Sequence, residues 1–125
     1  ETIKKYLIKN KMKIEDLGCS SLDAVDYPDY AKLLAIKIKN NNNSFGLLFC
    51  GTGIGISMAA NRFPHVRAAL CTSVEMASKS RKHNDANVLA LGGRILTEEL
   101  SKEIVFEFLN TKFEEGRHLL RVKKI

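Results

Sequence analysis

The chain has 125 residues, of which 45% are hydrophobic and 27% charged; it is long enough for one core, and its composition excludes a disordered chain. No apolar run approaches the ~20 residues that a membrane span requires, so we expect no membrane partner. The net charge of +6 would suit a nucleic-acid ligand, but no zinc-finger spacing or aromatic-interleaved basic motif accompanies it. We therefore expect no nucleic-acid partner, and a small anionic substrate is an equally natural use of the charge.

Helical and strand-like segments alternate along the chain. In order, the sequence predicts a helix over 2–10, a weak strand over 14–17, a helix over 28–40, and then three strand–helix pairs at 45–50 and 54–62, 66–71 and 74–81, and 87–91 and 98–109. The strands are unbroken apolar runs, which is typical of a parallel sheet covered by helices on both faces. We predict a three-layer α/β/α, Rossmann-like doubly wound fold with about five strands.

The chain opens directly in a helix, whereas the first strand of a doubly wound sheet usually lies in the middle of the strand order. We expect the natural protein to begin earlier, with one strand and its loop before Glu1. Residues 1–125 would then form a single domain that lacks its N-terminal strand.

Two of the predicted helices carry capping signals at their starts. Thr97 can cap the helix over 98–109, whose first turn is acidic. Thr72 stands three residues before Glu75, which is the spacing of a capping box for the helix over 74–81.

The three cysteines are odd in number, widely spaced and form no CxxC pair, so a disulfide framework or a cysteine zinc site is not expected. This use of cysteine fits a reducing compartment, and no hydrophobic signal core opens the chain, so we predict a cytoplasmic protein. Cys71 ends a predicted strand without glycines beside it, and we expect neither Cys71 nor Cys19 to be catalytic.

A buried strand runs into a glycine-rich turn at Cys50–Gly55, and a helix of small residues follows. The turn is not a dinucleotide fingerprint, because Ile56 stands where the third glycine of GxGxxG belongs, nor a P-loop, because it has no lysine. The remaining feature of this segment is Cys50, at the carboxyl end of a strand, which is where open α/β sheets bind ligands. It is expected to face backbone amides, which stabilise a thiolate. A lone cysteine at a strand end is more often simply a buried apolar residue. The adjoining glycines favour the interpretation of Cys50 as a reactive thiol.

Three other polar groups are candidates for a site. One precedes the strand over 87–91 and consists of His83, Asn84, Asp85 and Asn87. It is typical either of a ligand site or of an Asx-rich helix stop.

Two arginine groups complete the candidates. Arg94 follows a pair of glycines at a strand end, so its guanidinium should lie at the same sheet edge as Cys50. Arg117 and Arg121 would share one face of a helix, which suits a phosphate group, although a solvated basic tail has the same pattern. His65 lies in a predicted loop and is expected to be exposed.

These groups belong to a series of motifs that runs through essentially the whole chain. The motifs are Asp26–Ala31 (DYPDYA), Cys50–Gly55 (CGTGIG), Ala59–Asn61 (AAN), Arg67–Ala69 (RAA), His83–Val88 (HNDANV), Gly92–Arg94 (GGR) and Gly116–His118 (GRH). In this order they resemble the type B ribose-5-phosphate isomerases and their galactose-6-phosphate isomerase relatives.

The resemblance implies interconversion of ribose 5-phosphate and ribulose 5-phosphate through a cis-enediolate, with no metal or organic cofactor. It assigns Cys50 as the base that moves a proton between C1 and C2, and Thr52 as an aid to proton exchange between the sugar oxygens. The backbone amides of Gly51–Gly55 would stabilise the enediolate as an oxyanion hole does; they are those of Gly51, Thr52, Gly53, Ile54 and Gly55.

The resemblance also implies further contacts to a phosphorylated sugar. His83 would open the furanose ring, and Asn84 and Tyr27 would contact the sugar. Arg117 and Arg121 match phosphate-binding arginines, and Arg94 is a further candidate. The family is dimeric or a dimer of dimers with active sites shared between subunits, so the tail at 112–125 is expected to reach a partner subunit.

The chain departs from the family at its start, where a strand ending in a Ser-Asp-His-Ala-Gly-like turn is expected and is missing. A six-carbon substrate such as galactose 6-phosphate or allose 6-phosphate stays open as an alternative, because sequence does not report pocket size. A catalytically silent sugar-phosphate-binding module is the other alternative. Cys50, Thr52 and His83 are all kept, which favours a self-sufficient homo-oligomer.

Overall fold

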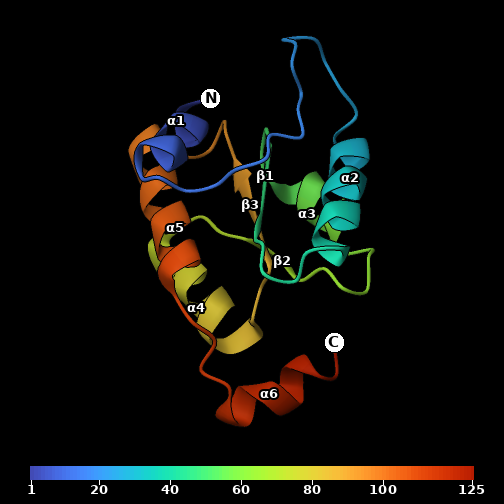
Figure 1. The fold of residues 1–125 in the computed structure, drawn as a ribbon, viewed down its shortest axis with the longest axis vertical. Coiled ribbons are helices and arrows are strands. Elements are labelled where there is room, and N and C mark those ends of the chain that lie inside the picture. Colours follow the sequence, from blue (N-terminus) through green and yellow to red (C-terminus); the bar gives the residue numbers. More distant parts are fainter.

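The computed structural model describes residues 1–125 and contains six helices and three strands (Figure 1). They are α1 (Thr2–Lys9), α2 (Tyr27–Lys39), β1 (Gly46–Cys50), α3 (Ile54–Ala60), β2 (Ala68–Leu70), α4 (Val74–Asn84), β3 (Val88–Gly92), α5 (Glu98–Asn110) and α6 (Gly116–Val122). No helix is long and apolar enough to cross a membrane.

The three strands form one parallel sheet in the order β1-β3-β2, with Cys50 of β1 opposite Gly92 of β3. Helices α2 and α3 cover one face, and α1, α4 and α5 cover the other, as Figure 1 shows. The predicted three-layer α/β/α fold with a parallel sheet is confirmed.

The central strand β3 explains why the core has two halves. Every residue of β3 is buried, and successive side chains point to opposite faces of the sheet. Val88 and Ala90 pack with α2 and α3, while Leu89 and Leu91 pack with α4 and α5. A strand buried on both faces needs apolar residues at every position, which is the unbroken run seen in the sequence.

The sequence predicted four strands within residues 1–125 and a fifth before Glu1; three of the four form the sheet, and the weak strand over 14–17 is not formed. The backbone of this segment makes no hydrogen bond to a strand. Its apolar residues serve another purpose, because Ile14 packs against the half-core under α4 and α5 and Leu17 against the half under α2 and α3. Apolar character alone therefore did not identify a strand here.

One of the two predicted caps is confirmed and the other is wrong by one residue. The Thr97 side chain accepts a hydrogen bond from the Leu100 N–H at 3.2 Å at the start of α5. In α4 the cap is Ser73, whose Oγ accepts from the Met76 N–H at 3.2 Å. Thr72 lies one residue outside the helix, so the capping box with Glu75 is not formed.

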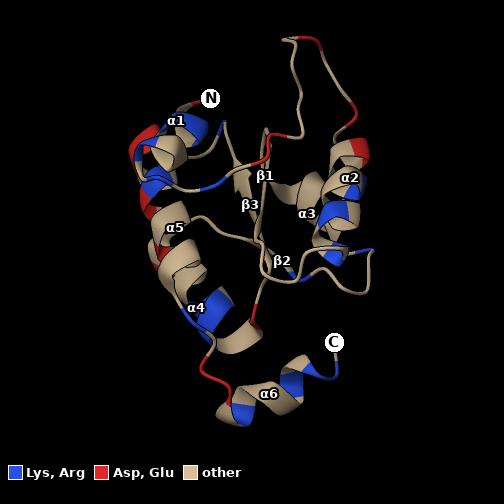
Figure 2. Ribbon diagram, in the orientation of Figure 1, with Lys and Arg blue, Asp and Glu red and all other residues tan.

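Helix α6 lies apart from both half-cores, at the end of the molecule where α4 finishes (Figure 1). No residue after Leu109 belongs to either hydrophobic cluster. Lys and Arg residues mark α6 and the end of α4 in Figure 2. The C-terminal segment is thus a basic arm on the domain, not a layer of its core.

Candidate active site

Cys50 is the last residue of β1 and lies half-buried at the carboxyl edge of the sheet. The chain turns back immediately, so that the Gly53 N–H donates a hydrogen bond to the Cys50 Sγ at 3.1 Å. This N–H is a backbone donor directed at the sulfur. The predicted cysteine facing a turn of backbone donors is therefore present.

Gly53 is the residue that allows this turn to form. Its φ of +79° lies in the left-handed region, which disfavours side chains. A Cβ at this position would also stand 2.5 Å from Leu70 Cδ1 and 3.0 Å from the Leu91 carbonyl carbon. The turn can pack onto β2 and β3 only because no side chain is present.

Tyr27, at the start of α2, reaches the same turn. Its ring lies directly over Gly55, where an added Cβ would be 2.6 Å from the tyrosine Cζ and Oη. Tyr27 is 43% exposed, so the ring contacts the turn while part of it faces outward. The structure thus brings Tyr27 to the turn that follows Cys50, although the two residues are 23 positions apart in the sequence.

Arg94 approaches the turn from the end of β3. Its N–H donates to the Gly51 carbonyl at 3.0 Å, and the Gly93 N–H donates to the Cys50 carbonyl at 2.8 Å. The guanidinium covers Gly51, since a Cβ there would be 3.2 Å from Arg94 Nη1. A cation beside the cysteine at this edge matches the prediction from sequence.

Thr52 lies at the exposed tip of the turn, where its Oγ1 accepts a hydrogen bond from the Ile54 N–H at 3.3 Å. The carboxyl edge of the sheet therefore gathers the predicted residues Tyr27, Arg94 and Cys50–Gly55 into one cluster, which we call the cysteine cluster.

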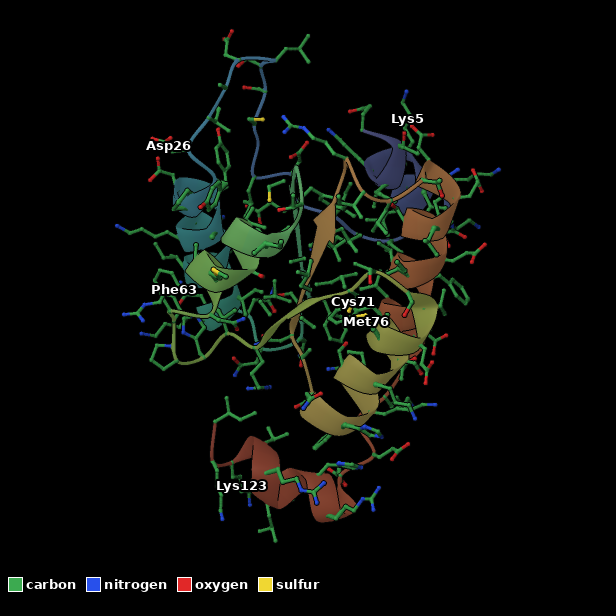
Figure 3. The ribbon with its side chains drawn as sticks, turned by 180° about the vertical axis from the view of Figure 1, so that it is seen from behind. Lys5, Asp26, Phe63, Cys71, Met76 and Lys123 are labelled. Atoms are coloured by element: carbon green, nitrogen blue, oxygen red, sulfur yellow. The ribbon has the colours of Figure 1, made fainter.

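The other predicted site residues lie at the opposite edge of the sheet. His83 and Asn84 end α4, just before β3 begins, and Arg117 and Arg121 are exposed one turn apart on α6. The five residues of β3 separate the two edges by at least about 13 Å. In Figure 3, Lys123 just after α6 and Asp26 just before α2 mark these two ends. The single chain does not bring His83 to Cys50.

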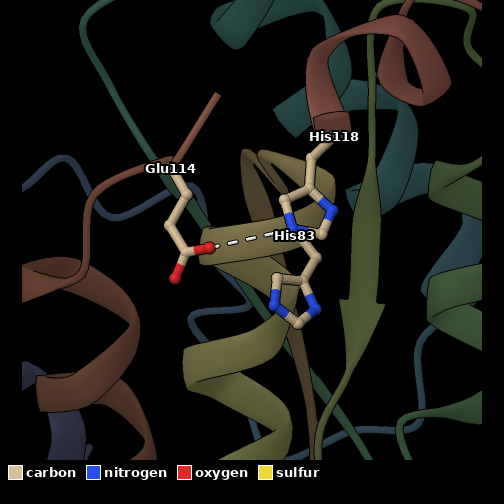
Figure 4. Close-up of side chains that lie close together, drawn as sticks. All are labelled: His83, Glu114 and His118. Atoms are coloured by element: carbon tan, nitrogen blue, oxygen red, sulfur yellow. Dashed lines mark ion pairs between the residues drawn. The ribbon is translucent and has the colours of Figure 1, made fainter. Parts of the chain in front are cut away.

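His83 is held by a contact that the sequence did not indicate. Its ring stacks on that of His118 with centroids 4.2 Å apart and an interplanar angle of 14°. Glu114 Oε2 stands 3.7 Å from His118 Nε2, as Figure 4 shows. Burial, followed by the charges of His83 and Arg117, lowers the pKa of His118. We call these three residues the histidine cluster.

The polar group between α4 and β3 divides into a structural part and a free part. Asp85 has a φ of 47° at the end of α4, and it accepts from Arg81 Nη1 at 2.9 Å and from Arg67 Nη2 at 3.3 Å. Asn87 bonds the backbone of Arg67 and His65. The helix-stop interpretation therefore holds for Asp85 and Asn87, and His83 and Asn84 are the residues left for a ligand.

Two residues have roles that the sequence analysis missed. Arg81 is buried and also donates to the Ala86 and Thr111 carbonyls, so it fastens the segment after α5 to the start of β3. Its i, i+4 spacing to Asp85 was the available signal. His65 is not simply exposed, because its Nε2 lies 2.7 Å from the Ala35 carbonyl oxygen.

The remaining two cysteines differ in burial. Cys71 is 1% exposed, and this burial raises the pKa of its thiol to about 11, against a smaller opposing effect of a hydrogen bond to Ser80. Cys19 is exposed and unpaired. Neither has the glycine turn that surrounds Cys50.

The fold and the cysteine cluster define a small α/β protein with a parallel sheet, a class in which ligands bind at the carboxyl edge of the strands. A family model described as Ribose/Galactose Isomerase matches residues 1–125. The chain belongs to this family, which confirms the resemblance seen in the motifs.

Individual relatives of the chain are named as members of the same family. The chain is 48% identical over 122 residues to a probable ribose-5-phosphate isomerase B of Mycoplasma pneumoniae, a match covering 97% of this chain and 80% of that protein. A crystal structure of a ribose 5-phosphate isomerase of Thermotoga maritima superposes with a TM-score of 0.96 at 48% identity, over 98% of this chain and 85% of that one. A Mycoplasma genitalium ribose-5-phosphate isomerase B with bound ribulose-5-phosphate has a TM-score of 0.94 and 44% identity, over 98% and 82%.

Proposed function

We propose that the protein is an isomerase that interconverts ribose 5-phosphate and ribulose 5-phosphate. The observation that carries this proposal is the Cys50 thiol at the carboxyl end of β1, with its sulfur bonded by the Gly53 N–H and Arg94 beside it. The relative of known structure that holds ribulose-5-phosphate supports the choice of substrate.

In this proposal the Cys50 thiolate removes the proton from C2 of the open-chain aldose. The electron pair of the broken C–H bond forms the C1=C2 double bond of the enediolate, and the negative charge moves to O1. Return of the proton from the Cys50 thiol to C1 gives the ketose and restores the thiolate. Thr52, which is exposed in the same turn, is proposed to exchange the proton between the two sugar oxygens.

The backbone of the turn supplies the electrostatic part of the mechanism. Amides fixed in place before the reaction stabilise developing negative charge without the cost of reorienting a solvent. The turn packs onto β2 and β3 at Gly53, and Tyr27 covers it at Gly55, so these donors have little freedom to move. Tyr27 is proposed to contact the sugar itself as well.

We further propose that two copies of the chain share each active site. His83, Asn84, Arg117 and Arg121 lie at the amino edge, out of reach of Cys50 in the same chain. A second copy would bring them to the cysteine cluster, where the arginines would bind phosphate and His83 would open the sugar ring. The segment at 112–125, which adds nothing to either half-core, is the proposed arm to that partner.

The surface is consistent with such an assembly. Phe49 of β1 and Ile54 and Met58 of α3 are large apolar side chains that are exposed on the elements forming or flanking the cysteine cluster. A cavity of about 540 Å³ includes Asn84 and Ile125 in its lining but not Cys50. A homodimer would cover the apolar residues and complete the site.

A cytoplasmic location is proposed because all three cysteines are unpaired, which fits a reducing compartment.

Six-carbon sugar phosphates remain the rival substrates. An assay of the chain with ribose 5-phosphate, allose 6-phosphate and galactose 6-phosphate decides between them, and turnover of a six-carbon sugar alone would contradict the proposed substrate.

Replacing the thiol tests the mechanism. Cys50→Ala should reduce kcat for ribose 5-phosphate by about a thousandfold, because no other base lies in the turn. Substrate binding, measured by calorimetry, should survive. Cys19→Ser is the matched control, since it removes an exposed thiol elsewhere and should leave kcat unchanged. Full activity of Cys50→Ala would exclude the proposed base, and an inactive wild-type chain that still binds sugar phosphate would support the silent binding module.

A further inference from the structure

We propose that the histidine cluster, composed of His83, Glu114 and His118, is a binding site for Zn²⁺. The three side chains come from the end of α4, the segment before α6 and α6 itself. One ligand atom from each lies within 4.8 Å of the others. Two imidazoles and a carboxylate are a donor set that Zn²⁺ accepts, with water in the fourth position.

The hydrogen bonding of the two imidazoles supports this assignment. Neither ring forms a hydrogen bond within the chain, and Glu114 Oε2 stands 3.7 Å from His118 Nε2. His118 is nevertheless only 6% exposed. A nearly buried imidazole whose nitrogens are free of protein partners is available as a metal ligand, unlike His65, whose Nε2 contacts a carbonyl.

The backbone holds the three donors together before any ion binds. The Glu114 N–H donates to the Lys82 carbonyl at 3.1 Å, which fixes the segment before α6 against the last turn of α4. Ligands of a tetrahedral zinc ion stand about 3.4 Å apart, so atoms that now lie as much as 4.8 Å apart must close by up to about 1.4 Å. The half-buried His83 and the exposed Glu114 can make this movement, and the His83 ring must tilt out of the stack.

Nearby charges limit the affinity and separate this site from an anion site. Arg117 and Arg121 both repel a cation, and both would attract a phosphate. The two ligands therefore respond in opposite directions to the loss of an arginine. Removing the Arg117 charge should strengthen zinc binding and weaken binding of a sugar phosphate.

Calorimetric titration with Zn²⁺ tests the site, in the full chain carrying Cys19→Ser and Cys50→Ser so that thiolates do not bind the ion. One ion per chain is expected. Glu114→Gln and His118→Gln should each weaken binding by at least about tenfold, and Arg117→Gln should strengthen it. Glu115→Gln is the matched control, because it removes the adjacent exposed carboxylate and should change nothing.

Absence of zinc binding, or equal binding by Glu114→Gln and the parent, overturns the site. Glu114 is exposed, so this variant decides the question even if His118→Gln does not fold.

Inhibition of the isomerase by zinc is a consequence that rests on the proposed role of His83. In a chain whose cysteines are unchanged, the Glu114→Gln substitution should raise the zinc concentration needed for inhibition at least about tenfold. Binding without inhibition overturns that consequence alone, and a chain without isomerase activity leaves the titration valid.

Discussion

Cys50 and Cys71 occupy similar places in the sequence, each at the end of an apolar run that becomes a strand. The structure surrounds Cys71 with the half-core under α4 and α5, where its thiol is buried. Cys50 is only half-buried, and its sulfur accepts a hydrogen bond from Gly53. The glycines next to Cys50 were the signal that separated the two, because they allow the backbone to turn toward the sulfur.

The buried thiol of Cys71 makes stability depend on pH in the alkaline range. Burial raises its pKa from an ordinary 9.0 to about 11, so the unfolded chain loses this proton first. Between pH 9 and 11 the folded state binds more protons, and the free energy of unfolding therefore falls as the pH rises, by about 2–3 kcal/mol from this group. Below pH 9 the group has no such effect.

Urea denaturation across this pH range measures the effect. Cys71→Ala lowers stability overall, but its free energy of unfolding should fall less steeply with pH than that of the wild type. Cys19→Ser should keep the wild-type slope, because that thiol is exposed in both states. Parallel slopes for wild type and Cys71→Ala would contradict the assignment.

At the scale of elements, apolar runs located the helices and strands well, and their ends depended on single polar residues. Helix α4 continues to Asn84, three residues past its predicted end, because Asp85 adopts a left-handed conformation and its carboxylate binds Arg81 of the last turn. The segment 14–17 shows the opposite case. Its apolar residues pack on the core, yet it pairs with no strand.

The start of α4 offers a direct test of the corrected cap. Ser73→Ala removes the acceptor of the Met76 N–H and should lower the free energy of unfolding by about 1 kcal/mol. Thr72→Ala is the matched control, since Thr72 lies outside the helix and its hydroxyl bonds no backbone N–H. Chemical denaturation of both variants decides, and a larger loss from Thr72→Ala would restore the capping box.

At the scale of the whole molecule, the parallel sheet separates the residues that the family motifs place in one site. Strands of a parallel sheet all end at the same edge, so Cys50 and Arg94 meet there. The helix that leads into β3 ends at the other edge, which puts His83 there together with α6. One chain therefore places the two proposed half-sites at opposite edges of the sheet.

Mixing two inactive variants tests whether two chains combine these half-sites. Cys50→Ala and His83→Asn should each be inactive alone. After unfolding and refolding together, half of the dimers are mixed and each carries one intact site, so about a quarter of wild-type activity should return.

The control mixes Cys50→Ala with Thr52→Val. Both changes lie in the cysteine cluster, so every site in a mixed dimer keeps one defect and no activity should return. Failure of the first mixture to regain activity, with mixed dimers shown to form, would rule out the shared site.

The sequence alone determined the alternation of helices and strands, the parallel sheet, the cysteine beside a glycine turn and the family. These properties follow from short-range patterns, since apolar periodicity reports burial and the glycines of Cys50–Gly55 report a backbone turn. Only the tertiary structure decided which polar residues are structural. Asp85 bonds Arg67 and Arg81 bonds Thr111, so these two residues support the fold, whereas His83 only stacks on His118. The sequence could not show this, because each of these partners is distant in the chain. The position of each half-site was decided in the same way, by the edge of the sheet at which each helix and strand ends.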